Sequence, residues 1–85
     1  MSTIDYLDRF LDPVTDAFTP EFARSIIGLR ADAEMAAHVA VLRQKANEGT
    51  LSPEEQADYR DFVEAVDFLS IIQSKARKFL AKNTI

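Results

Sequence analysis

Apolar residues recur at helical spacing over one long stretch of the chain, from Ser52 to about Asn83. Three or four residues separate the members of one row, which comprises Tyr59, Phe62, Val66, Leu69, Ile72 or Gln73, Ala76 and Leu80. A second row widens this face with Val63, Phe68, Ile71, Lys75 and Phe79. Ser52 and Glu55 match a capping box, and Pro53 suits the first helical position. The pattern predicts a single helix of about 45 Å.

The apolar stripe is widest between Val63 and Ile72, where six of ten residues are large and apolar. A stripe of this width faces more than one neighbouring helix. Two interpretations remain open at this point: an ordinary core, or a core combined with a dimer or partner interface. The interface residues expected under the second interpretation are Phe62, Val66, Phe68, Leu69, Ile72 and Phe79.

Two shorter helices are predicted upstream. The first covers Thr3 to Leu11, and one face of it carries Ile4, Leu7, Phe10 and Leu11. Pro13 is expected to move Asp12 out of the helical region, which would let Asp12 cap a further turn. Thr19-Pro20-Glu21 is a second start signal, with Phe18 and Ala23 at hydrophobic-staple positions. This second helix is expected to carry Phe22, Ile26, Ile27 and Leu29 inward and to weaken at Gly28.

A third helix is predicted from Ala33 to Glu48, capped by Asp32 and ended by Gly49. The short connection to Ser52 predicts that this helix and the long one are antiparallel neighbours. The third helix spans only about 24 Å. The far half of the long helix must therefore be covered by the N-terminal helices or by a second copy. The predicted fold is all-α and a single domain over residues 1–85, with a hairpin (about 33–48 and 53–83) and two short N-terminal helices.

Composition narrows the class of protein. Two Gly, three Pro and an apolar fraction of 47% fit a folded helical chain, and the net charge of −4 makes the protein acidic. This charge argues against nucleic acid or an anionic membrane as the main partner. The chain has no Cys, no basic-then-apolar leader and no apolar run of about 20 residues. A cytoplasmic location is the resulting expectation.

Charge is polarised along the long helix. Six acidic residues and Arg60 give a net charge of −5 between Ser52 and Leu69, whereas the stretch from Ser70 to Ile85 carries +4. This order complements the helix macrodipole. The alternative is a phosphate contact through Lys75, Arg77, Lys78 and Lys82. The acidic residues Asp58, Asp61, Glu64 and Asp67 form either a solvated face or a mimic of nucleic acid.

No catalytic or cofactor motif is present, so neither an enzyme activity nor a cofactor is expected. His38 is the only histidine, and Glu34 lies four residues before it. Two ligands do not make a zinc site, so His38 is expected to be partly exposed beside small alanines, without a metal. The aspartates at positions 5, 8 and 12 share one helix face and are expected to be solvated.

Several segments resemble a family of small uncharacterised bacterial helical proteins. The resemblance rests mainly on the stretch from Lys45 to Glu55, and also on Phe10–Val14, Thr19–Glu21, Leu29–Asp32 and Ile72–Arg77. Members of this family are encoded beside nucleases of the HNH type. The resemblance implies no activity, cofactor or functional residue for this chain.

These patterns lead to one functional hypothesis and two alternatives. The hypothesis is a non-enzymatic, homodimeric interaction module that binds and restrains another protein, in an antitoxin-like or nuclease-accessory role. The first alternative is a small DNA-associated regulator that uses the basic end of the long helix. The second is a purely structural protein that assembles with itself.

Overall fold

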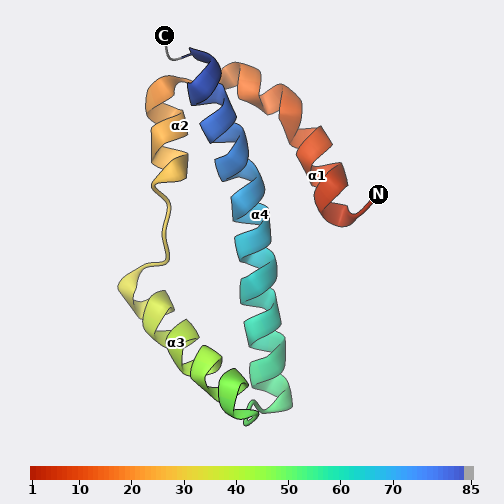
Figure 1. Cartoon of the computed structure of the whole chain (residues 1–85), viewed down its shortest axis with the longest axis vertical. Coiled ribbons are helices and arrows are strands. Elements are labelled where there is room, and N and C mark those ends of the chain that lie inside the picture. The colour runs from red at the N-terminus through yellow and green to blue at the C-terminus, as the bar shows by residue number, and fades with distance from the viewer. Residues whose placement is uncertain (84–85) are drawn as a thin grey trace. The chain divides into compact units, whose positions relative to one another are not determined.

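The computed structural model describes residues 1–83, which contain four α-helices, one 3-10 helix and no strand (Figure 1). The predicted all-α class is therefore confirmed. The elements are α1 (Thr3–Leu11), η1 (Asp12–Ala17), α2 (Pro20–Ile27), α3 (Ala33–Glu48) and α4 (Pro53–Asn83). No helix among the described residues combines the length and the apolar character needed to cross a membrane.

Local side chains fix where the helices start. The Ser52 hydroxyl accepts the Glu55 amide at 3.1 Å, and the Glu55 carboxylate accepts the Ser52 amide at 3.0 Å, which completes the predicted capping box. Thr19 and Asp32 cap α2 and α3 as expected. Ser2 forms a further capping box with Asp5, which the sequence reading did not identify.

The expectation for Asp12 was wrong. Its backbone stays helical (φ −51°, ψ −48°), and the chain passes from α1 directly into η1 without a side-chain cap. The tight 3-10 turn places Pro13 at its start, and the Asp12 carbonyl accepts the Thr15 hydroxyl at 2.7 Å. The Asp12 carboxylate does not cap the turn and instead pairs with Lys75.

The described residues fall into two compact units, which we treat separately. The first unit contains residues 1–29 and the chain from 67 onward. Its buried core is Phe18, Ala23, Ile26 and Ala76, with Ile27, Ile72, Phe79 and Leu80 packed around it. Ala23 and Ala76 are 0% exposed, so small side chains let α2 lie close to α4. Within this unit, Phe18 and α2 therefore pack against part of α4, whereas Phe68 remains 46% exposed.

Aromatic contacts join the core of this unit. The Phe18 ring packs edge-on against Phe79 and Phe22, with ring centroids 5.7 Å and 5.3 Å apart. Phe22 and Leu29 were expected to point inward, but both side chains are about half exposed. Helix α2 has only eight residues, so Ala23 and Ile26 fill its buried face and leave the flanking positions in solvent.

The second unit contains residues 30–66, that is, α3 and the first part of α4. Val39 and Leu42 are its buried apolar residues, whereas Met35 on the same predicted row is exposed. Gly49 adopts a left-handed conformation (φ 73°), and its amide closes the end of α3 on the Ala46 carbonyl. The chain then enters α4 after three further residues.

Candidate functional site

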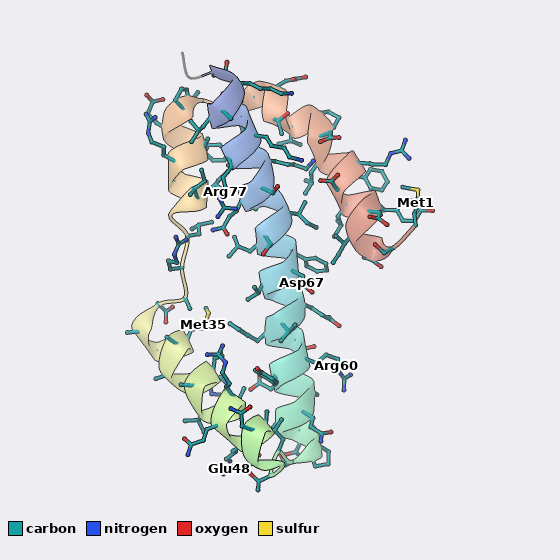
Figure 2. The ribbon with its side chains drawn as sticks, viewed as in Figure 1. Met1, Met35, Glu48, Arg60, Asp67 and Arg77 are labelled. Carbon is teal, nitrogen blue, oxygen red and sulfur yellow. The ribbon has the colours of Figure 1, made fainter. Side chains whose placement is uncertain are left out.

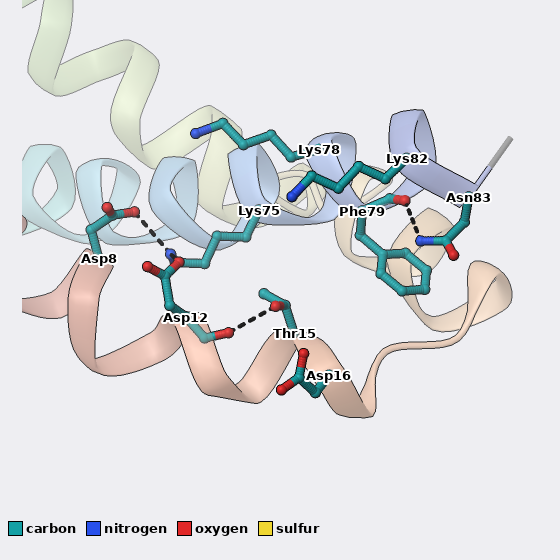
Figure 3. A pocket seen from close by; sticks show the side chains of 9 residues that line it. All are labelled: Asp8, Asp12, Thr15, Asp16, Lys75, Lys78, Phe79, Lys82 and Asn83. Carbon is teal, nitrogen blue, oxygen red and sulfur yellow. Dashed lines mark hydrogen bonds and ion pairs between the residues drawn. The ribbon is translucent and has the colours of Figure 1, made fainter.

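A buried lysine joins three elements of the first unit. Lys75 is 5% exposed, and its ammonium lies 3.0 Å from the Asp8 carboxylate of α1. It also pairs with the Asp12 carboxylate of η1 (Figure 3). The aspartates at positions 8 and 12, expected to be solvated, thus share one cation, although each keeps more than half of its side-chain surface exposed.

The charges of this cluster shift the pKa values of its members in opposite directions. Burial by itself disfavours the Lys75 ammonium, but its hydrogen bonds and ion pairs with Asp12 and Asp8 outweigh that effect and raise the pKa of Lys75. The hydrogen bond from Lys75 lowers the pKa of Asp12, and Lys78 and Lys82 lower it further. Lys75 and Asp12 are therefore ionised at neutral pH.

An open hollow of about 460 Å³ lies beside this cluster (Figure 3). The positive and negative charges of its lining are equal in number. Lysines line it at positions 75, 78 and 82, and aspartates line it at positions 8, 12 and 16. Thr15, Phe79 and Asn83 complete the lining. The Lys78 and Lys82 ammonium groups form no ion pair with a carboxylate of residues 1–83. A hollow with equal numbers of cations and anions gives little net attraction for polyanions.

The four basic residues expected at a phosphate contact therefore have different surroundings. Lys75 is buried and neutralised by its own chain. Lys78 and Lys82 are exposed but share their hollow with carboxylates, and Arg77 is exposed on α4 outside that lining (Figure 2). Three cations, not four, are thus available to a phosphate group.

Gln73 is the second buried polar side chain of α4, at 9% exposure. Its amide nitrogen lies 3.1, 3.4 and 3.2 Å from the carbonyls of Ile26, Ile27 and Leu29, to which it donates. These carbonyls belong to the end of α2 and the residues just beyond it, and the Ile26 carbonyl also accepts the Leu29 amide at 3.1 Å. The apolar row predicted from the sequence allowed either Ile72 or Gln73 at this position. The polar amide of Gln73 within that row was the one sequence signal for this contact.

The six residues expected at an interface do not share one environment. Ile72 and Phe79 pack against the core of the first unit, and Phe62 and Leu69 are partly buried. Val66 and Phe68 remain exposed, at 40% and 46%. Val66 and Phe68 are therefore the two of these six side chains with the most surface exposed.

The most exposed aromatic side chain among residues 1–83 lies on α1, and its exposure was not expected from the sequence. Phe10 is 77% exposed, although it was expected to point inward with Ile4, Leu7 and Leu11. At 3.6 residues per turn, Phe10 lies about a quarter turn from the centre of that row. It shares its face with Tyr6, and these two rings and Arg9 line a shallow hollow of about 300 Å³.

His38 belongs to the second unit and is about half exposed, as expected. Its Nε2 atom lies 2.6 Å from the Asp58 carboxylate of α4. Glu34 lines the same open surface hollow as His38 but forms no ion pair with it. Among residues 1–83, no three His, Asp or Glu side chains converge in a way that could hold a metal ion.

No protein-family model, curated protein or solved structure matches this chain. Functional inference therefore depends on the surfaces described above.

Proposed function

We propose that this chain is a non-enzymatic protein-interaction module that forms a homodimer and binds a second protein. The distribution of its apolar side chains carries the proposal. Among residues 1–83, twelve large apolar side chains are at least 39% exposed, whereas seven apolar side chains are buried. No large side chain in this part of the chain is fully buried. Exposed apolar surface on this scale is typical of interaction sites.

Association would also compensate for a small core. A domain of this size buries a limited share of its surface and has little stability to spare. Each apolar Å² removed from water contributes about 25 cal/mol, and an interface of ordinary size buries about 800 Å² per partner. Binding to the folded state alone stabilises that state by mass action.

The proposed frame is an antiparallel hairpin of residues 33–48 and 53–83 with the N-terminal helices docked on its far half. Within the second unit, an ion pair and a hydrogen bond link its two helices: Lys45 lies 2.6 Å from Glu55, and the His38 ring lies 2.6 Å from the Asp58 carboxylate. Within the first unit, Lys75 and Gln73 hold the N-terminal segments. Within each unit, these contacts can hold the exposed side chains of that unit in a fixed geometry.

The proposed second partner is a basic protein, which the chain restrains in an antitoxin-like or nuclease-accessory role. Asp58, Asp61, Glu64 and Asp67 are exposed on α4, so they are available to a basic surface. The resemblance to a family encoded beside HNH nucleases supports the same choice. The proposed location is cytoplasmic.

A DNA-associated regulator is the alternative. The structure leaves fewer basic side chains for DNA phosphates than the sequence indicated. Lys75 is neutralised by Asp8 and Asp12, which leaves Arg77, Lys78 and Lys82. Non-specific DNA binding requires several phosphate contacts and weakens steeply with salt. A purely structural, self-assembling protein is the other alternative, and it would associate with no second protein.

Two measurements separate these functions. Sedimentation equilibrium of the purified chain is expected to show a dimer, and a tagged pull-down at native expression is expected to retain one further protein at a fixed ratio. A chain that stays monomeric and retains no protein would contradict the proposal. A mobility shift on DNA at low salt that disappears at higher salt would favour the regulator instead.

A further inference from the structure

The outer face of α1 combines exposed aromatic rings with an unused cation. Phe10 is 77% and Tyr6 54% exposed, and they lie one helical turn apart. Arg9 lies beside both rings at the same hollow. Its guanidinium lies 3.8 Å from the Met1 sulfur and forms no ion pair with a carboxylate of residues 1–83. Tyrosine and arginine are enriched among the residues that dominate protein interfaces.

A carboxylate of matching spacing lies on the same helix. Asp5 precedes Arg9 by four residues, so the two side chains occupy the same flank of α1. One carboxylate oxygen of Asp5 accepts the Ser2 amide at 2.9 Å, which leaves the other oxygen for a further partner. The hydrogen bonds from Ser2 lower the pKa of Asp5, so this carboxylate is ionised at neutral pH.

The outer face of α1 is self-complementary: it can pair with the same face of a second copy related by a two-fold axis. When two α1 helices lie antiparallel about an axis near Leu7, position 9 of each copy lies opposite position 5 of the other. The same operation brings the aromatic faces of the two helices together. Closed two-fold symmetry with a self-complementary patch is the commonest arrangement of homodimers.

We propose that the outer face of α1, formed by Tyr6, Phe10, Arg9 and Asp5, is the dimer interface and that its occupant is the α1 face of a second copy. The rings of the two copies pack against each other, and Arg9 of each copy pairs with Asp5 of the other. This proposal rests on the homodimer proposed above and adds its location and symmetry.

The exposed area of the two rings is large enough for the centre of an interface but smaller than a whole interface. An aromatic side chain can bury about 150–250 Å², so the exposed parts of Phe10 and Tyr6 amount to about 250 Å² per copy. An interface of ordinary size needs about 800 Å² per partner. Val14, which is exposed on η1 at 48%, supplies further apolar surface in the same segment. The aromatic pair therefore forms the centre of the contact, and its neighbours form the margin.

A substitution at Phe10 tests the location. Phe10→Asp is expected to leave the helix content unchanged, because the side chain is exposed, and to raise the dimer dissociation constant about 100-fold or more, because both copies lose an anchor. Val41→Asp is the matched control, since Val41 is an exposed apolar residue of α3 at 53%. It is expected to dimerise as the wild type does. The measurement is sedimentation equilibrium, with circular dichroism as the check on folding.

A charge exchange tests the symmetry. Arg9→Glu alone and Asp5→Lys alone each place like charges opposite each other, so each variant is expected to dimerise more weakly than the wild type. An equimolar mixture restores two opposite pairs and is expected to form a heterodimer. The Ser2 hydroxyl still caps α1 in Asp5→Lys, because it accepts the backbone amide of residue 5.

The outcomes separate this inference from the proposed function. A dimeric wild type whose association is unchanged by Phe10→Asp would overturn the α1 interface and leave the homodimer intact. The same holds if only Val41→Asp dissociates the dimer, or if mixing the two charge variants restores nothing. A wild type that is monomeric would overturn the homodimer itself, and the inference with it.

Discussion

Replacing Gln73 with methionine tests whether one amide group holds α2 against α4. Methionine has nearly the volume of glutamine and a similar helix propensity, so the change removes the donor without opening a large cavity or weakening α4. The Gln73 amide carries two protons, and three carbonyl oxygens lie 3.1–3.4 Å from its nitrogen. The variant therefore loses the equivalent of two hydrogen bonds.

The expected cost follows from those two bonds. A typical hydrogen bond contributes about 1 kcal/mol net to stability, so two lost bonds amount to about 2 kcal/mol. Leu29 is half exposed, so water can reach part of this site and reduce the penalty. We expect Gln73→Met to lower the free energy of unfolding by about 2 kcal/mol.

Gln73→Glu sharpens the same test, because it keeps the shape and replaces the donor with a carboxylate facing carbonyl oxygens. Burial and those oxygens raise the pKa of the introduced carboxyl in the folded protein. Its protonated form regains one donor. The destabilisation is therefore smallest below the ordinary Glu pKa of about 4.3, and it grows as the pH rises through the raised folded value.

The assay is a urea titration followed by circular dichroism at one fixed protein concentration, since association adds to the apparent stability. A loss of about 2 kcal/mol moves the midpoint by about 1–2 M for a small protein. Gln56→Met at an exposed position of α4 is the control and is expected to stay within about 0.5 kcal/mol of the wild type. If Gln73→Met unfolds at the control's midpoint, or the Glu variant lacks the pH trend, the amide does not hold α2.

Three further predictions follow from the same contacts. Lys75→Met is expected to lower the urea midpoint at pH 7, because it removes the shared partner of Asp8 and Asp12 and leaves both carboxylates unpaired. Urea midpoints should also show less acid destabilisation than in the wild type. In the wild type, the lowered pKa of Asp12 adds stability above about pH 3.9 that is lost as the pH falls through the folded value. Gly49→Ala should cost about 1 kcal/mol in a thermal scan because its φ is 73°, whereas Gly28→Ala, with φ −76°, should be neutral or slightly stabilising. Phe79→Asp should unfold the first unit rather than release a folded monomer, because Phe79 packs on Phe18; a folded, monomeric variant in sedimentation and circular dichroism would contradict this.

The helices could be predicted from the sequence because their signals are local. The Ser52–Glu55 capping box, the Thr19 and Asp32 caps, and Gly49 each act within one turn of the residue concerned. Hydrogen bonds inside one helix end need no partner from elsewhere in the chain. Asp12 was predicted wrongly, since its backbone stays helical before Pro13 and its carboxylate pairs with Lys75, 63 residues away, rather than capping the next turn.

The candidate site could not be predicted in the same way, because its contacts join distant segments. Lys75 and Gln73 occupy an apolar row, and the sequence does not show that carboxylates of α1 and carbonyls after α2 meet them. Phe10 differs in kind. Its quarter-turn offset from the buried row was present in the sequence, and a stricter helical projection would have placed it outside.

The two buried polar side chains of α4 restrict which helices can pack on its C-terminal half. Apolar contacts are not directional, so the row containing Ile72 and Ala76 would accept many amphipathic helices. Lys75 and Gln73 accept few, because a foreign helix would leave an ammonium and an amide buried without partners. The chain's own N-terminal helices satisfy both groups. Association must then use surfaces that stay exposed after this docking, and the aromatic face of α1 is such a surface.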